Sequence, residues 1–173
     1  MKNKKILLVG GCGFIGHNLA LNFKKLGAEP VIVDSLAVNN IYSFKNDEIK
    51  NKKLYSSILN NRIELINKKK IKLIIHDARD YHGISKIYSQ VNPDIIIHLA
   101  AVSHSNKSNK DPHSTFDHSL RTLENSLDFA KNNKTHLIYI SSSMVYGNFN
   151  SKNVNEETAC NPIGIYGTLK YSG

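Results

Sequence analysis

A glycine-rich segment near the amino terminus most constrains the fold of this chain. Residues 5–34 contain an apolar run, a turn, a helical pattern and a second apolar run that ends on Asp34. The turn fits both the G-x-G-x-x-G and the G-x-x-G-x-x-G spacing, through Gly10, Gly11, Gly13 and Gly16. Such glycines let the backbone turn tightly and approach a pyrophosphate, and the helix that follows offers unpaired N–H groups to it. The segment therefore predicts a strand–turn–helix–strand unit that binds a dinucleotide.

Asp34 predicts which dinucleotide this unit prefers. An acid at the end of the second strand accepts hydrogen bonds from the ribose hydroxyls. The same carboxylate would repel a 2′-phosphate, so we expect NAD rather than NADP. Two alternatives stay open at this point: a glycine turn that only shapes the backbone, and an Asp34 that is only a solvated strand end.

Length and hydropathy are those of one globular domain. The chain has 173 residues, enough to bury a sizeable core. No apolar run reaches the roughly 18 residues that span a bilayer, and the first apolar run enters the glycine turn too soon for a signal peptide. Two cysteines, Cys12 and Cys160, give no disulfide framework and fit a reducing compartment. We expect one domain over residues 1–173, in the cytoplasm and away from membranes.

The net charge of +9 comes from lysines scattered along the whole chain. No basic stripe with interleaved aromatic residues, no helix-turn-helix pattern and no spacing of zinc ligands is present. We therefore expect a solvated, lysine-rich surface, without a nucleic-acid partner and without a metal site. A positive field of this size also attracts anionic ligands such as nucleotide sugars.

Strand and helix patterns alternate along the chain. Near-continuous apolar runs, typical of strands buried on both faces, predict strands over residues 4–9, 30–34, 71–77, 94–99 and 135–142. Helical patterns are expected over residues 14–26, 80–90 and 112–132, and residues 47–68 should be part helix, part excursion. The fold class is then α/β, a doubly wound parallel sheet of the Rossmann type with right-handed crossovers. The chain stops inside a helical pattern with no closing strand, so we expect the C-terminal substrate-binding part to be missing.

Hydroxyl groups and a lysine gather in the last third of the chain. Tyr166 and Lys170 form a Y-x-x-x-K pattern, and residues four apart share one face of a helix. A lysine ammonium near a tyrosine hydroxyl favours the phenolate, which can act as a general base. Three serines, residues 141–143, follow the fifth expected strand, where ligands of parallel sheets bind. Turn formation and helix capping are the alternative explanation for these serines.

Taken in order, these motifs resemble one family. The glycine turn, Asp34, the HDARD segment at 76–80, the HLAA segment at 98–101, the serines with VYG at 145–147, and the Tyr166/Lys170 pair occur in its sequence order. The chain resembles the extended short-chain dehydrogenase/reductase superfamily, specifically the NAD-dependent sugar-nucleotide epimerase/dehydratase family. The resemblance covers the whole chain.

The resemblance implies roles for particular residues. It implies that Ser142 bonds the reacting oxygen, Tyr166 is the acid/base, and Lys170 binds the nicotinamide ribose and tunes Tyr166. It implies a nucleotide-sugar substrate, hydride transfer between sugar C4 and NAD, and a homodimer in the full-length protein. Together with Tyr166 and Lys170, the cofactor would contact Gly10, Gly13, Phe14, Ile15, Gly16, Asp34, Ser35, Asp77, Ala78, Leu99, Ala100 and Ala101.

Two departures from the family pattern bear on the reaction. Dehydratases of this family carry an Asp-Glu pair where this chain has Ser143 and Met144, and Met144 cannot transfer a proton. Arg121 stands where the family usually has a glycine, which leaves the packing near the cofactor open. A 4-epimerase of the UDP-glucose 4-epimerase kind is the leading hypothesis. A reductase, dehydratase or decarboxylase on the same scaffold, and a non-catalytic NAD-binding module, are the alternatives.

Overall fold

The computed structural model describes residues 1–38, 40–44, 51–103, 105–149 and 152–173. A five-stranded parallel sheet lies at its centre, with the strand order β3-β2-β1-β4-β5. The strands are β1 (Lys5–Val9), β2 (Glu29–Asp34), β3 (Lys72–Ile75), β4 (Ile95–His98) and β5 (His136–Tyr139). None of the helices in these residues is long and apolar enough to cross a membrane.

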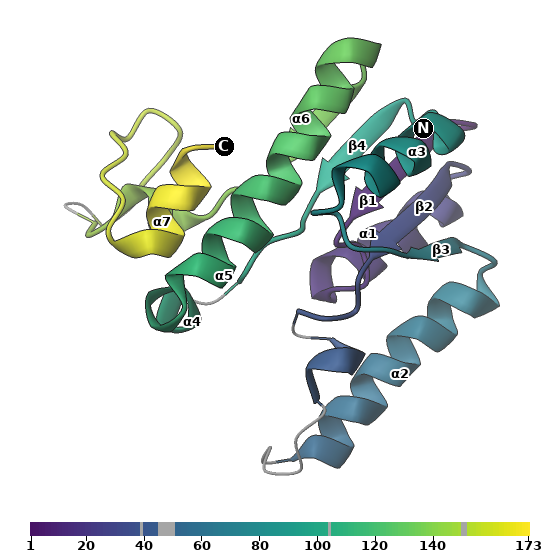
Figure 1. Ribbon diagram of the computed structural model, residues 1–173, viewed down its shortest axis with the longest axis horizontal. Coiled ribbons are helices and arrows are strands. Elements are labelled where there is room, and N and C mark those ends of the chain that lie inside the picture. Colours follow the sequence, from purple (N-terminus) through teal and green to yellow (C-terminus); the bar gives the residue numbers. More distant parts are fainter. Residues whose placement is uncertain (39, 45–50, 104, 150–151) are drawn as a thin grey trace.

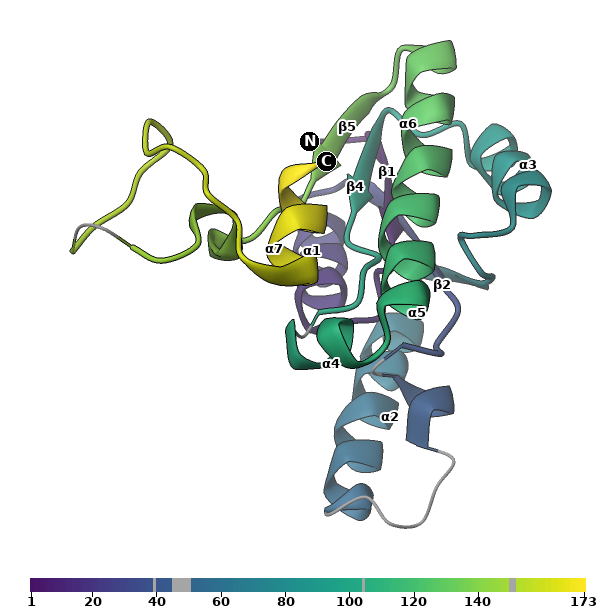
Figure 2. The same ribbon diagram turned by 60° about the vertical axis from the view of Figure 1, so that its left-hand side comes forward.

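Helices cover both faces of the sheet (Figures 1 and 2). On one face, Ile6 and Leu8 of β1 pack with residues of α1 (Phe14–Lys25) and α2 (Lys52–Lys68). On the other face, Leu7 and Val9 pack with residues of α3 (Tyr81–Val91) and α6 (Thr122–Asn133). Because successive strand residues point to opposite faces, a strand buried on both sides must be apolar throughout, as β1 is. The prediction of a doubly wound α/β sheet is confirmed.

The register brings the carboxyl ends of the strands to one edge of the sheet. Val9 lies between Val33 and His98, and the next position of β2, Asp34, lies beside Ile75. The loops that carry the predicted cofactor residues leave the sheet from this edge. It is therefore the edge at which open parallel sheets bind ligands.

Short helical segments connect the sheet to the rest of the chain. The excursion after β2 contains η1 (Ile41–Phe44), and α2 projects beyond the sheet (Figure 1). Residues 47–50, the first part of the segment expected to be partly helical, lie outside the described residues. The other short elements are α4 (Ser105–Lys110), α5 (Pro112–Phe116), η2 (Asp117–Arg121), η3 (Ser143–Tyr146) and α7 (Gly164–Tyr171).

The single helix expected over residues 112–132 is interrupted. It begins where the Asp111 carboxylate accepts a hydrogen bond from Ser114 N, and it then widens into the π-helical turn η2 before α6 begins at Thr122. A π-helical turn inserts one residue without changing the apolar spacing on either side, so periodicity does not reveal it. Two of the expected strands extend past the observed ends: β3 ends at Ile75 rather than Asp77, and β5 ends at Tyr139 rather than Ser142.

Candidate cofactor site

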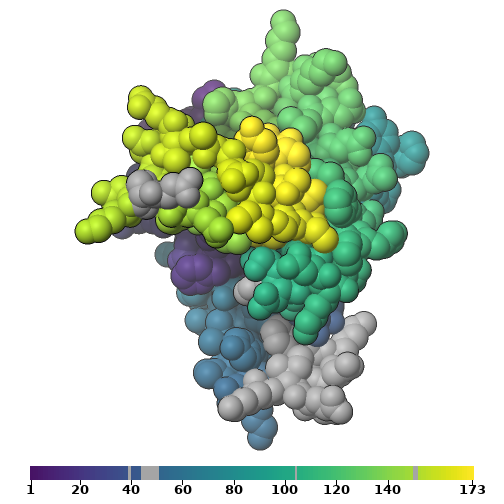
Figure 3. Space-filling view, turned by 90° about the vertical axis from the view of Figure 1, so that its left-hand side faces the viewer, coloured from purple at the N-terminus to yellow at the C-terminus, as the bar shows by residue number. Residues whose placement is uncertain are grey.

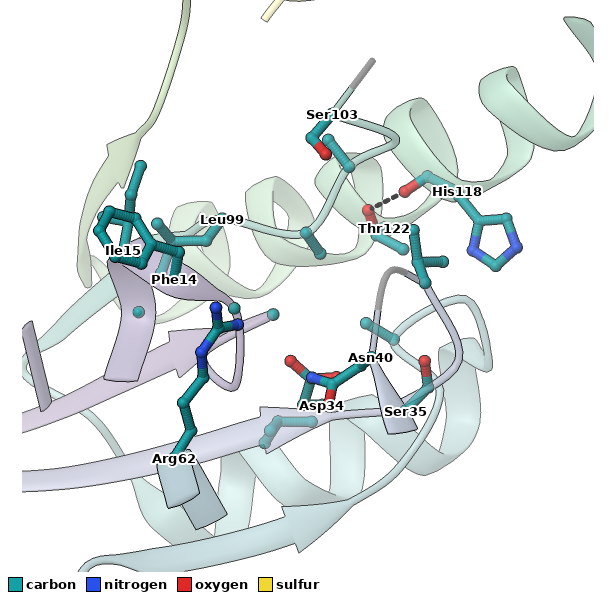
Figure 4. Close-up of a pocket in the computed structure, with 18 of the residues that line it drawn as sticks. Phe14, Ile15, Asp34, Ser35, Asn40, Arg62, Leu99, Ser103, His118 and Thr122 are labelled. Carbon is teal, nitrogen blue, oxygen red and sulfur yellow. Dashed lines mark hydrogen bonds between the residues drawn. The ribbon is translucent and has the colours of Figure 1, made fainter. Parts of the chain in front are cut away.

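A cavity of about 510 Å³ opens at the carboxyl edge of the sheet (Figure 4). Its walls come from the glycine turn and the start of α1, the ends of β2, β3 and β4, α2, and the η2–α6 junction. Twelve of the predicted cofactor residues line it: Gly10, Gly13, Phe14, Ile15, Gly16, Asp34, Ser35, Asp77, Ala78, Leu99, Ala100 and Ala101. Segments as far apart in the sequence as Gly10 and Thr122 thus meet around one cavity.

Gly10 and Gly16 are required by the packing of the protein itself. Gly10 has φ of +77°, and a Cβ on it would lie 2.7 Å from the Ala100 backbone. A Cβ on Gly16 would lie 2.5 Å from Gly11 Cα, closer than real side chains come. These glycines let α1 and the β4 loop approach the turn.

Gly13 is different, because no atom of the described residues requires a glycine there. Its φ of −69° suits any residue, and a Cβ on it would have its nearest neighbour, Gly10 O, at an ordinary 3.6 Å. Gly13 is the N-cap of α1 and makes no side-chain cap, and no acidic residue lies in the first turn. The first N–H groups of a helix have no acceptor within the helix, and they carry partial positive charge. The space beside Gly13 and this helix end together fit an anionic group.

Asp34 anchors the turn to the end of β2. One carboxylate oxygen accepts a hydrogen bond from Cys12 N and the other accepts one from Leu36 N, both at 2.8 Å. Burial raises the pKa of Asp34 above its ordinary value, although these two N–H groups oppose the rise. Each carboxylate oxygen keeps a second lone pair, so the group can still accept bonds from a ligand hydroxyl.

The segment after β3 is held by an arginine. Arg79 donates through Nη2 to Asp77 Oδ2 and through Nη1 to Asp117 Oδ2, both at 2.6 Å. This guanidinium holds the pKa of Asp77 below its ordinary value. Asn125 of α6 donates to the Ala78 carbonyl oxygen at 2.8 Å. Both contacts fix Asp77 and Ala78 against the helices that follow β4.

A buried polar chain fixes the segment after β4. His98 is fully buried, with Nε2 3.1 Å from Ala100 O and Nδ1 2.9 Å from Ser126 Oγ. A carbonyl can only accept, so Nε2 carries the proton and Nδ1 accepts from the serine. Burial and, to a lesser degree, the nearby Lys170 ammonium lower the pKa of His98 to about 3. The ring is therefore neutral and holds the Ala100 carbonyl in place.

The predicted catalytic residues lie at the same end of the sheet but outside the lining of the cavity. Helix α7 packs against η3 and α4 (Figure 3), and Ser141 Oγ donates to Lys170 O at 2.9 Å. Lys170 is buried, and Nζ donates to Ile140 O at 2.6 Å. Burial lowers the pKa of Lys170. Ser142 caps η3 by accepting a hydrogen bond from Met144 N, and Tyr166 is half-buried on α7.

Several residues of the cavity were not predicted from the sequence. Arg62 of α2 points into it from one side, and the Thr122 hydroxyl, bonded to His118 O at 2.9 Å, faces it from the other (Figure 4). The sequence could have singled out Arg62, because only three of the 23 basic residues are arginine. Arg121, which stands at a usual glycine position, is exposed and pairs with Glu124. Within the described ranges, no group of three or more His, Cys, Asp or Glu side chains is placed to hold a metal ion.

The fold and the glycine-lined cavity define a dinucleotide-binding α/β protein. A family model described as GDP-mannose 4,6 dehydratase matches residues 7–173. The chain therefore belongs to this family of NAD-dependent sugar-nucleotide epimerases and dehydratases.

Individual relatives agree with this assignment. Protein CapI of Staphylococcus aureus is 29% identical over 97% of this chain and 47% of its own length. The UDP-glucose 4-epimerase of Dictyostelium discoideum is 27% identical over 96% of this chain and 44% of its own length. The crystal structure of UDP-glucose-4-epimerase from Stenotrophomonas maltophila, with bound NAD and formylated UDP-arabinopyranose, superposes with a TM-score of 0.80 at 25% identity. The superposition covers 98% of this chain and 46% of the Stenotrophomonas chain. This chain therefore spans about half the length of the relatives it matches.

Proposed function

We propose that this chain is the NAD-binding part of a nucleotide-sugar 4-epimerase. The observation that carries the proposal is the space at Gly13, where an open Cβ position, an uncapped helix end and the Asp34 carboxylate border one cavity. A Cβ could occupy this space in ordinary contact with the described residues, at 3.6 Å from Gly10 O, so a glycine there is best explained by a ligand. The relatives that are named as 4-epimerases, one of them crystallised with NAD, support the choice of cofactor and reaction.

The residues present fit this cofactor. The start of α1 would hold the pyrophosphate, Asp34 and Ser35 the adenosine ribose, and Asp77 and Ala78 the adenine. Leu99, Ala100 and Ala101 would lie along the nicotinamide half. Bound NAD would supply a reversible hydride acceptor for the carbon at sugar C4.

The chemical work of the protein itself would fall to three side chains. Tyr166, as phenolate, would take the proton of the C4 hydroxyl and return it after the keto sugar has turned over. Lys170 would stabilise the phenolate and bind the nicotinamide ribose, and its position four residues after Tyr166 puts both on one face of α7. Ser142 would bond the reacting oxygen.

Epimerisation is favoured over dehydration by two neighbouring residues. A 4,6-dehydratase of this family uses an Asp-Glu pair after the catalytic hydroxyl residue, and this chain has Ser143 and Met144 in η3. A thioether cannot transfer a proton. We therefore propose an isomerase, although the family model is described as a dehydratase.

We further propose that the full-length protein is a homodimer. Phe116 of α5 and Leu127 of α6 are large apolar side chains, and each is 47% exposed. Burial of such side chains against a second copy would be favourable. Sedimentation of the full-length protein at several concentrations tests this proposal, and a concentration-independent monomer would contradict it.

The cofactor proposal is tested by titration of the 173-residue chain with NAD. Gly13→Ala should fold normally and bind NAD roughly tenfold more weakly or worse, because the new methyl group would occupy the pyrophosphate space. A chain that binds no NAD would contradict the proposed cofactor. So would a Gly13→Ala variant with unchanged affinity.

The reaction is tested with the full-length protein. It is mixed with NAD and a panel of UDP-, GDP-, dTDP- and CDP-sugars, and inversion at C4 is followed. Tyr166→Phe should abolish turnover without loss of NAD binding. NAD binding without turnover of any sugar would instead favour a non-catalytic NAD-binding module.

A further inference from the structure

Arg62 is a cationic side chain that points into the cavity and has no acidic partner among the described residues. It lies in the middle of α2, is half-buried, and extends toward the start of α1 (Figure 4). Its guanidinium carbon lies 5.9 Å from the centroid of the Phe14 ring, a cation–π distance. In the part of the chain that the structure describes, it forms no ion pair.

Among the described residues, the Asp34 carboxylate lines the same cavity as Arg62 but forms no ion pair with it. Asp34 already accepts one N–H bond on each oxygen, from Cys12 and Leu36. The guanidinium is nevertheless close to the glycine turn: burial and Asp34 raise the pKa of the Cys12 thiol, and the Arg62 charge opposes that rise. The cation is thus held beside the turn and faces the cavity.

Two sources of positive charge therefore border the same space. The first turn of α1 contributes its unpaired N–H groups from one side, and Arg62 contributes a planar set of donors from α2. Arginine binds phosphate oxygens with two parallel N–H bonds, which a lysine ammonium cannot do. Most basic residues of this chain are lysine, so an arginine at position 62 indicates a role that needs the planar guanidinium group.

We propose that Arg62 binds the diphosphate of the dinucleotide, on the side opposite the helix end of α1. The Phe14 ring orients the guanidinium for this contact, so Phe14 is a positioning residue. This inference rests on the proposed NAD site and adds an anion-binding residue to it. In NADP the ribose 2′-position also carries an anionic group, and the Asp34 carboxylate makes this position unfavourable for a phosphate.

The test compares ligands with and without a diphosphate. The 173-residue chain is titrated by NMR with NAD, ADP-ribose and adenosine, in the unaltered form and as Arg62→Gln, Arg62→Lys and Lys53→Gln. Lys53 is an exposed cation on the same helix, so its variant controls for the change in net charge. Arg62→Gln should weaken NAD and ADP-ribose roughly tenfold and leave adenosine unchanged. Arg62→Lys should be intermediate, and Lys53→Gln should match the unaltered chain.

Each other outcome overturns the inference in a recognisable way. Equal weakening for adenosine would mean that Arg62 only supports the packing of α2. A loss confined to NADP in a parallel titration would assign the guanidinium to the 2′-position, and a loss confined to UDP would assign it to the sugar nucleotide. Undiminished NAD affinity in Arg62→Gln would overturn this inference alone, whereas an unaltered chain that binds no NAD would overturn the proposed function with it.

Discussion

Arg79 and Asp117 are joined by a 2.6 Å ion pair between a turn and a helical segment that follow different strands. Arg79 follows β3, and Asp117 opens the π-helical turn after β4. The same guanidinium bonds Asp77. One side chain therefore ties two walls of the cofactor cavity together, and the polypeptide between the two residues includes α3 and β4.

Arg79→Met should lower the free energy of unfolding by about 1 kcal/mol at neutral pH, a modest value because these groups are about one-third exposed. The pKa of Asp77 is lowered by Arg79, so the stabilisation is present above the ordinary carboxylate pKa near 4 and is lost as the pH falls below it. Urea unfolding of both proteins at pH 7 and pH 3 measures this. A difference that does not shrink at pH 3 would contradict the ion-pair explanation.

Gly16→Ala should destabilise the fold by roughly 2–4 kcal/mol, because the added methyl group must push α1 away from the Gly11 backbone. Gly13→Ala is the matched control and should stay within about 1 kcal/mol of the unaltered chain. Urea unfolding curves give both values. Equal stability of the two variants would show that the turn tolerates side chains at either position.

His98 should make stability depend on pH. Its folded pKa of about 3 lies below the unfolded value near 6.5, so between these values the unfolded chain binds one more proton. Stability should therefore fall as the pH drops from 7 to 5, with a contribution of about 2 kcal/mol from this residue. His98→Gln cannot titrate and should show a pH dependence weaker by that amount. Identical pH profiles for the two proteins would argue against a buried neutral ring.

Cys12 and Cys160 should differ in their reaction with a thiol reagent. Cys160 is exposed, whereas Cys12 is fully buried and burial raises its pKa. Only thiolates react, so one thiol should react quickly in the folded chain and the second on the order of 100-fold more slowly. Cys160→Ser should remove the fast phase. Two fast thiols in the native protein would mean that the glycine turn opens readily.

Asp34→Asn should shift cofactor preference. The amide is a weaker acceptor for ribose hydroxyls and no longer repels a 2′-phosphate, so the NAD-to-NADP affinity ratio should fall roughly tenfold. Titration with both dinucleotides measures the ratio. Glu29→Gln, at the exposed start of the same strand, is the control and should leave the ratio unchanged.

Much of the architecture was predictable because it follows from local sequence patterns. Apolar runs such as Ile6–Val9 mark strands buried on both faces, and the glycine turn marks where the first one ends. Twelve cofactor residues predicted from the resemblance lie around one cavity, because they lie at the end of a strand or in the segment that follows it, and the strands all end at the same edge.

The remaining features depend on tertiary packing that no local pattern records. Arg62 reaches the cavity because Ile63 and Ile66, the residues that follow it, pack their side of α2 against the sheet. The π-helical turn at 117–121 leaves the apolar spacing on either side intact, so the hydrophobic periodicity of the sequence does not reveal it. The contact of a substrate with Ser142, Tyr166 and Lys170 stays a prediction, because none of these three residues lines the cavity.

Gly13 and Gly16 would look equally invariant in any set of active descendants, yet they are kept for separate reasons. The packing of the protein itself requires Gly16, whereas under the proposed function only a bound ligand would keep position 13 a glycine. A lineage that abandoned the cofactor would be free to vary Gly13 first while Gly16 stayed fixed. The pattern of drift at these two sites would then serve as an evolutionary record of when binding was lost.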